Sequence, residues 1–246
     1  MGFSFIREAF MKHIFRFLGE KVDGVWVPSP EDVTHFIKVL RLKDGDLVEV
    51  ADGRGRWAVG RAEIRSKTSV EIREFDEFEA KKNEVVRGIA LGAIKTSDFE
   101  SYLPSLIELG LDEILIFYQS GQEKSRVTEK VLARWEKISR TAIKQCKRPW
   151  LPSIRYFDSL GDLLSFSDKF EKKFVLDAVG IPLTEGDFPS DQNVLGVVGS
   201  EAGISEEDMA KLEVSGFRKV SISDGILRAR TAALALAANF SFLQHR

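Results

Sequence analysis

The sequence predicts an α/β protein in two parts, a small antiparallel β-barrel followed by a larger domain with a parallel sheet. Short strand-like segments with tight turns fill the chain up to Glu74, whereas strands and helices alternate from residue 85 onward. A segment rich in charged residues, without a clear helical or strand periodicity, separates these two parts of the sequence. Strand–helix alternation is typical of a parallel sheet with helices on both faces. We therefore predict a barrel at 1–74, a linker at 75–84 and an α/β domain at 85–246.

The barrel is predicted from its strands and one turn. Strand-like segments at 47–50 and 57–64 flank Asp52-Gly53-Arg54-Gly55, a sequence typical of a hairpin, and another strand follows at 69–72. Short strands at this spacing favour a small antiparallel barrel. One helix interrupts them and is expected to begin at Ser29-Pro30 and run through Leu40, because Pro is favoured at the first helical position.

The second part has its own start and stop signals. We expect strands at 85–94, 113–118, 174–177, 194–198 and 219–222. Ser97 and Glu100 form an expected capping box for a helix that ends at Gly110. Ser205 is expected to cap a helix that ends at Gly216, and further helices are expected at 128–147 and 228–243.

Composition excludes several classes of protein. The formal charge is −2 and the pI is near 6.0, so bulk basicity does not predict a nucleic-acid partner. A single cysteine, Cys146, excludes an internal disulfide and fits a reducing compartment. The three histidines, His13, His35 and His245, are widely separated, and we expect no metal site. Charges interrupt the apolar segment at 3–17 and no apolar run spans a bilayer, so we expect a soluble cytoplasmic protein with no membrane partner.

Two C-terminal segments carry the best candidate for a ligand site. The apolar strand at 194–198 leads into Gly199-Ser200-Glu201-Ala202-Gly203, where small residues let a ligand approach the backbone closely. This segment is neither a P-loop nor G-x-G-x-x-G, and a tight turn without a ligand explains it equally well. The second segment, 222–228, ends in Arg228, a cation that stabilises developing negative charge or simply pairs with a carboxylate. Together they predict a pocket made of two loops.

Basic residues gather at the end of the helix expected at 128–147. Lys144, Lys147 and Arg148 precede Trp150, and this combination suits contacts with phosphate and a base. Cations at a helix C-terminus are also favoured by the helix dipole alone. Arg54 in the barrel carries the same ambiguity.

Four segments in order resemble one family. They are His35-x-x-x-Val39-Leu40-Arg41-Leu42-Lys43-x-Gly45-Asp46, then Ile107-Glu108-Leu109-Gly110, then Trp135-x-Lys137-Ile138 with Ala142-x-x-Gln145 and Arg148-x-x-x-Pro152, and finally the two C-terminal loops. In this order they resemble the 16S ribosomal RNA (uracil-N3)-methyltransferase family of the SPOUT superfamily. The resemblance covers nearly the whole chain.

The resemblance implies a PUA-like RNA-binding barrel and a SPOUT methyltransferase domain with a C-terminal trefoil knot. It implies S-adenosylmethionine as methyl donor, a homodimer, and methylation of N3 of a uridine in small-subunit ribosomal RNA, free or in the assembled subunit. Arg228 and Glu201 are the implied catalytic residues. The implied cofactor-binding residues are Leu176, Gly196, Val198, Gly199, Ser200, Glu201, Gly203, Ile222, Ser223, Ile226, Leu227 and Thr231. The expected RNA-binding residues are Arg41, Lys43, Arg54, Lys144, Lys147 and Arg148.

The chain departs from the family pattern near the expected site. Ser200 and Ala202 replace Pro and Gly, and Ala202 is harmless only if its φ is negative. Gly225 and Arg230 stand where the family usually has Arg and Glu, and Gln119-Ser120-Gly121 stands for Glu-Arg-Ser. These departures keep two alternatives open, a diverged RNA-binding SPOUT protein without the reaction and a methyltransferase acting on another RNA.

Overall fold

The chain divides into two compact units. The computed structural model describes residues 14–93, 95–120 and 127–244. One unit comprises Met1–Lys82 with Arg140–Leu151, and the other comprises Asn83–Ser139 with Pro152–Arg246. His13, His245, Gly121 and most of the apolar segment at 3–17 lie outside the described residues.

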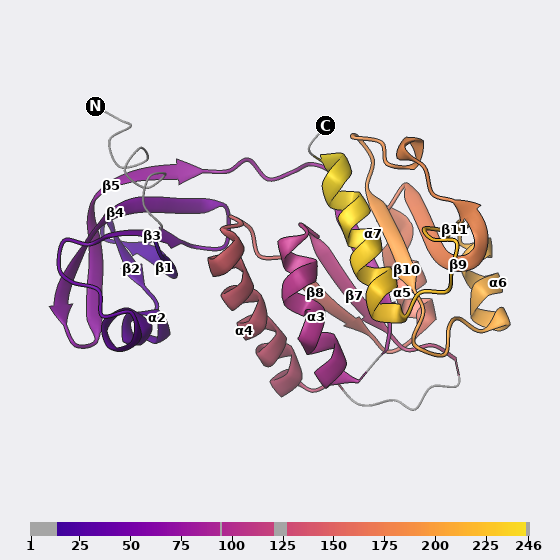
Figure 1. Cartoon of the computed structure of the whole chain (residues 1–246), viewed down its shortest axis with the longest axis horizontal. Helices are drawn as coiled ribbons and strands as arrows, with labels where there is room; N and C mark the ends of the chain where they lie inside the picture. The colour runs from indigo at the N-terminus through magenta and orange to yellow at the C-terminus, as the bar shows by residue number, and fades with distance from the viewer. Residues whose placement is uncertain (1–13, 94, 121–126, 245–246) are drawn as a thin grey trace. The chain divides into compact units, whose positions relative to one another are not determined.

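The first unit contains a closed five-stranded barrel (Figure 1). Its strands run in the order β1-β2-β5-β4-β3, with bounds Arg16–Val22, Val25–Pro28, Ser69–Glu79, Arg56–Ser66 and Leu47–Ala51. The β3–β4 pairing ends at Ala51 and Trp57, which confirms the hairpin across residues 52–55. Strands β1 and β3 pair in parallel, so the barrel is mixed rather than wholly antiparallel. Large buried side chains fill its interior, among them Phe17, Trp26, Phe36 and Ile72.

The helix in the barrel begins as predicted. Ser29 caps α2 (Pro30–Thr34) by accepting the Asp32 N–H, and the chain continues as the π-helix η1 (His35–Val39). Val33 and Phe36 of this segment are buried in the barrel core. The helix therefore covers the barrel interior.

The predicted start of the linker, at residue 75, is too early. Strand β5 continues through Glu79, and Trp57 pairs with Phe78 and Arg56 with Glu79 on β4. The rings of Trp57 and Phe78 are stacked with centroids 5.5 Å apart. Glu77 and Glu79, two of the charged residues that suggested a linker, are exposed on β5, whose backbone pairs with β4 and whose Phe78 ring stacks on Trp57.

The second unit contains a six-stranded parallel sheet in the order β11-β9-β10-β6-β7-β8. The strands, in chain order, are β6 Arg87–Gly92, β7 Glu113–Phe117, β8 Ser153–Phe157, β9 Lys172–Pro182, β10 Val194–Val198 and β11 Arg218–Ser221. The helices are α3 Thr96–Glu108, α5 Leu160–Phe166, α6 Glu206–Val214 and α7 Ala229–Gln244, together with the first part of α4 Glu129–Cys146, whose residues from Arg140 onward belong to the first unit. The sequence did not predict β8 or α5.

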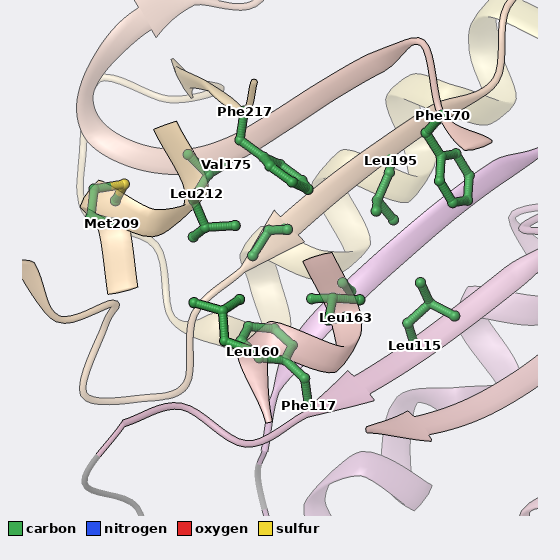
Figure 2. Close-up of a cluster of buried hydrophobic side chains, with 12 residues drawn as sticks. Leu115, Phe117, Leu160, Leu163, Phe170, Val175, Leu195, Met209, Leu212 and Phe217 are labelled. Atoms are coloured by element: carbon green, nitrogen blue, oxygen red, sulfur yellow. The ribbon is translucent and has the colours of Figure 1, made fainter. Parts of the chain in front are cut away.

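Helices cover both faces of this sheet, as predicted. Figure 2 shows one face, where Leu160 and Leu163 of α5 and Leu212 of α6 gather with Val175 and Leu195 of the sheet. On the opposite face α7 packs on β10, where a Cβ at Gly196 would lie 2.4 Å from Leu236 Cδ2. Helix α3 packs beside α7.

Two helix starts gave different outcomes. Ser205 caps α6 by accepting the Asp208 N–H at 3.1 Å, which confirms that prediction. The capping box at Ser97 is wrong, because α3 begins at Thr96 after Lys95 and has no side-chain cap. The predicted stops at Gly110 and Gly216 hold, since their φ angles of 93° and 86° suit glycine. No helix within the described ranges is both long and apolar enough to cross a membrane.

Candidate functional site

A cavity of about 750 Å³ lies in the second unit, at the carboxyl ends of β9, β10 and β11. Its walls include the loop at 199–204 after β10 and the loop at 222–228 between β11 and α7. Ligands of open α/β sheets bind beyond the carboxyl ends of the strands, and this volume is typical of a small-molecule site. The two loops singled out in the sequence therefore meet around one cavity.

An irregularity in β9 forms one wall of the cavity. Val175 pairs with Lys219 of β11 and Ile181 pairs with Val220, so residues 176–180 lie between the two paired stretches while β11 has none there. We call the unpaired residues 176–180 the β9 excursion. Asp177 Oδ1 accepts the Val179 N–H at 2.9 Å and stabilises this excursion. Leu176, Asp177 and Ala178 line the cavity as a result.

Glycine is required where the excursion returns to the sheet. A Cβ at Gly180 would lie 2.5 to 2.7 Å from backbone atoms of Val220. Backbone atoms cannot rotate away as a side chain can, so only a residue without a Cβ permits this approach.

The loop after β10 folds back on itself. Gly203 donates its N–H to the Ser200 carbonyl at 2.9 Å, and a Cβ at Gly199 would lie 2.8 Å from the Gly203 carbonyl carbon. Gly203 has a φ of 80°, a conformation that suits glycine. Ala202 is not among the described residues with positive φ, so its methyl group is tolerated.

Gln119, which follows β7, holds this loop from behind. Its Nε2 donates to the Gly203 carbonyl at 2.7 Å and its Oε1 accepts the Ser200 N–H at 2.8 Å. The next residue, Ser120, donates its N–H and its hydroxyl to the buried carboxylate of Asp208 on α6. Gln119 was noted in the sequence only as a departure from the family pattern and was not predicted to hold this loop; an amide directly after a buried strand was a usable signal.

Three charged side chains line the cavity: Asp177, Glu201 and Arg228. Glu201 and Arg228 are exposed, and neither forms an ion pair with another described residue. Arg228 is therefore not the carboxylate-paired cation of the alternative interpretation, as far as the described residues go. No group of His, Cys, Asp and Glu side chains in the described ranges has the arrangement of a metal site.

Most of the expected cofactor-binding residues come together. Those that line the cavity are Leu176, Val198, Gly199, Ser200, Glu201, Gly203, Ile222, Ser223, Ile226 and Leu227. Gly196 and Thr231 do not line it. Gly196 lies against Leu236 and permits α7 to pack closely on β10, whereas Thr231 is exposed on α7. The cavity-lining residue Asp177 was missed, although a carboxylate at the end of an apolar strand was a usable signal.

Arg230 does not line the cavity, although it departs from the family pattern near the expected site. Its guanidinium lies over the Tyr102 ring of α3, with 5.9 Å between the guanidinium carbon and the ring centroid. Burial raises the pKa of Tyr102 well above its usual range. Two residues after Arg228 on a helix, Arg230 points to another side, so its charge is not part of the cavity lining.

The expected RNA-binding residues of the first unit divide into two groups. Lys144 Nζ lies 2.5 Å from Asp32 Oδ1, and Lys147 Nζ lies 3.0 Å from Glu49 Oε2. Both carboxylates are buried, so these lysines neutralise charges inside the unit. The Arg148 carbonyl accepts a hydrogen bond from the Arg16 guanidinium, which also pairs with Glu49.

The remaining basic residues face solvent. Arg41 and Lys43 are exposed, and Arg54 is exposed although it pairs with Glu20 at 2.7 Å. The turn at 52–55 that carries Arg54 packs against the segment after α4. There Gly55 donates its N–H to the Pro149 carbonyl, and a Cβ at Gly55 would lie 2.2 Å from the Trp150 ring.

Comparison with curated proteins gives relatives that cover nearly the whole chain. A relative from Mesomycoplasma hyopneumoniae (strain 232), named Ribosomal RNA small subunit methyltransferase E, is 29% identical over 227 residues, which is 89% of this chain and 95% of that protein. A protein of the same name from Aquifex aeolicus (strain VF5) is 28% identical over 234 residues, covering 91% of this chain and 96% of that protein.

Solved structures share the fold. A probable rRNA-methyltransferase from Porphyromonas gingivalis superposes with a TM-score of 0.79 at 22% identity, over 94% of this chain and 99% of that one. A Ribosomal RNA small subunit methyltransferase E from Neisseria gonorrhoeae, bound to S-adenosyl methionine, gives a TM-score of 0.76 at 23% identity, over 94% and 98% of the two chains. The predicted combination of an N-terminal barrel and a parallel α/β domain is therefore confirmed.

Family profiles match both parts of the sequence. A profile described as RNA methyltransferase PUA domain matches residues 28–75, within the closed barrel. A profile described as RNA methyltransferase domain matches residues 81–241, a span that contains the parallel sheet, both cavity loops and the three charged residues that line the cavity. The chain thus belongs to the RNA methyltransferase family.

Proposed function

We propose that this protein transfers a methyl group from S-adenosylmethionine to N3 of a uridine in small-subunit ribosomal RNA, as a cytoplasmic homodimer. The observation that carries the proposal is the cavity at the ends of β9, β10 and β11, which combines a backbone-rich loop with one cation and two carboxylates. Family membership supports methyl transfer to RNA. The names of the relatives support the small subunit as the source of that RNA.

The cavity fits S-adenosylmethionine in volume and in charge. That cofactor carries a positive sulfonium and a positive ammonium, and the cavity offers the Asp177 carboxylate beside its apolar and backbone lining. Apolar side chains such as Val198, Met209 and Val220 supply the rest of the lining that a purine ring requires. We infer that the loops at 199–203 and 222–227 hold the cofactor through backbone groups. When bound, the cofactor supplies an electrophilic methyl group.

The two exposed charges suit the acceptor side of the reaction. Uracil N3 carries a proton that must leave before or during methyl transfer, and the resulting negative charge spreads onto the two carbonyl oxygens of the base. Arg228 is placed to stabilise that charge, because it lines the cavity without a described ion-pair partner. Glu201, which has no described hydrogen bond to its own loop, is our candidate to accept the N3 proton.

Calorimetry and a labelling assay test the proposal together. The protein should bind S-adenosylmethionine, and it should transfer labelled methyl groups to small subunits isolated from cells that lack the enzyme. Nucleoside mass analysis should then place the label on N3-methyluridine. Binding without transfer would favour the RNA-binding alternative, and label in another RNA would favour the other alternative. A folded protein that does not bind the cofactor would exclude the enzyme.

The RNA surface is proposed to include Arg41, Lys43 and Arg54 of the first unit, with Lys144, Lys147 and Arg148 in a supporting part. The first three are exposed, which phosphate contacts require. Replacing Arg41 and Lys43 together by Ala should weaken RNA binding and reduce its salt dependence by about one to two phosphate contacts. The affinity for S-adenosylmethionine should not change, because neither residue lines the cavity.

The homodimer and the trefoil knot are further parts of the proposal. Light scattering of the purified protein should give twice the chain mass of 27.7 kDa. A monomer that still transfers methyl groups would remove the dimer from the proposal without affecting the reaction.

A further inference from the structure

We propose that Gln119 is a positioning residue that holds the loop at 199–204 in its cofactor-binding shape. This inference rests on the proposed function, because the loop is taken to hold S-adenosylmethionine. Gln119 itself is absent from the cavity lining and is only 7% exposed, so it acts through the loop rather than by contact with the cofactor.

The Gln119 carboxamide joins two opposite kinds of backbone group. Its Oε1 accepts the Ser200 N–H at 2.8 Å, and its Nε2 donates to the Gly203 carbonyl at 2.7 Å. The Gly203 N–H in turn donates to the Ser200 carbonyl at 2.9 Å. The two ends of the turn are therefore tied to each other and to the same side chain, which fixes the backbone between them.

Only a neutral amide, or a protonated acid, can make both hydrogen bonds. An ionised carboxylate accepts the Ser200 N–H but has no proton for the Gly203 carbonyl, and the two oxygens would repel each other. An apolar side chain of the same length makes neither bond. The conformation of the loop therefore depends on the hydrogen-bonding groups of the side chain at position 119, and not only on the size of that side chain.

Gly92 leaves room for the Gln119 side chain beside the loop. A Cβ at Gly92, at the end of β6, would lie 2.1 Å from Gln119 Oε1 and 2.6 Å from the Ser200 nitrogen. On the following residue, Ser120 donates two hydrogen bonds to Asp208 of α6, the helix that starts after the loop. The end of β7 thus holds both the loop and the helix that follows it.

Three variants test the inference by their affinity for S-adenosylmethionine. Gln119→Met should weaken binding about tenfold to a hundredfold at any pH, because two backbone groups lose a buried partner. Gln119→Glu should show a similar loss at pH 8 and should regain most of the affinity as the pH falls toward 6. Burial and the facing carbonyl raise the pKa of a Glu at this site, and the protonated acid restores both hydrogen bonds.

Gln192→Glu is the matched control, because its residue precedes β10 and lies at the other end of that strand from the loop. Its affinity should equal that of the wild type at every pH. The pH profile of the wild type serves as the reference for other ionisable groups near the loop. These include Glu201 and Asp208, together with Lys211, which pairs with Asp208, and Glu207, which pairs with Lys211.

The outcomes separate this inference from the proposed function. If the wild type binds no cofactor, the proposed function fails. If the wild type binds and Gln119→Met binds equally well, the inference on Gln119 fails alone. A Gln119→Glu loss that does not change with pH would also overturn it, since a general structural defect has no reason to follow one proton. Thermal melting of the cofactor-free variants shows that each variant is folded if it unfolds in one cooperative transition; a lower midpoint is expected for Gln119→Met because it loses two hydrogen bonds.

Discussion

Among single residues, whether a basic side chain has an ion-pair partner says more about its role than whether it is Arg or Lys. Arg228 lines the cavity and has no ion-pair partner among the described residues, whereas Lys144 and Lys147 pair with the buried carboxylates of Asp32 and Glu49. In the sequence all three are simply cations near small or aromatic residues. Their surroundings place Arg228 at the proposed site of the reaction and pair the two lysines with buried carboxylates.

Arg228→Ala should lower the rate of methyl transfer about 100-fold to 1000-fold, as expected for the loss of one group that stabilises developing charge. The dissociation constant for S-adenosylmethionine should change less than about threefold, because a reagent that binds to backbone groups does not depend on this side chain. Single-turnover transfer and calorimetry measure the two effects. Equal losses in both would make Arg228 a cofactor-binding residue instead.

Lys144→Met should lower the free energy of unfolding by about 2 to 3 kcal/mol, because it leaves the Asp32 carboxylate buried without its cation. Asp32 also accepts the Leu18 N–H at 2.6 Å, so the loss should disturb the start of β1. Urea unfolding measures the change. Lys67→Met, at an exposed turn, should stay within about 0.5 kcal/mol of the wild type. Unchanged stability with weakened RNA binding would make Lys144 an RNA contact after all.

At the level of elements, the cavity exists because β9 is irregular. A regular pairing of β9 with β11 would place residues 176–180 in the sheet, and the excursion places Leu176, Asp177 and Ala178 at the cavity instead. The excursion ends where Gly180 passes the Val220 backbone. The position of one glycine thus decides whether this wall of the site forms.

Gly180→Ala should lower the free energy of unfolding by about 1 to 3 kcal/mol and weaken S-adenosylmethionine binding, because the added methyl group overlaps the β11 backbone. Thermal melting and calorimetry measure both. Gly186→Ala is a suitable control, since its nearest neighbour, Thr184 Oγ1, is 3.9 Å from the added carbon. Normal binding by Gly180→Ala would show that the excursion does not shape the site.

At the level of the whole molecule, each compact unit has its own hydrophobic core. The cavity belongs entirely to the second unit, and the barrel to the first. The first unit also takes residues 140–151, whose Lys144, Lys147 and Trp150 contact barrel residues. The first unit therefore includes a segment that is separated in sequence from the barrel strands by residues 83–139.

A cofactor at about one hundred times its dissociation constant should stabilise the unit that binds it by about 2.7 kcal/mol. Amide hydrogen exchange should show the added protection in the second unit, centred on residues 194–204 and 218–229. The barrel strands should exchange at their cofactor-free rates. Added protection spread evenly over both units would show instead that the chain unfolds as one body.

Local signals in the sequence predicted most elements correctly. The apolar run at Val194–Val198 is strand β10, Ser205 caps α6, and the turn at residues 52–55 joins β3 to β4. Each of these structures is specified by residues that are close together in the sequence. The linker failed because β5 continues through Glu79, and Ser97 failed as a cap because its helix begins at Thr96 and already contains it.

The sequence by itself determined the two-part architecture, the location of both cavity loops and the residue types around them, because periodicity and turn chemistry are local properties. Only the tertiary structure decided that Gln119 holds the loop at 199–204, that Asp177 enters the cavity and that Lys144 neutralises a buried charge. Gln119 and Gly203 are 84 residues apart, and Lys144 and Asp32 are 112 apart. Contacts at such separations depend on how strands and helices pack, and no local pattern records them.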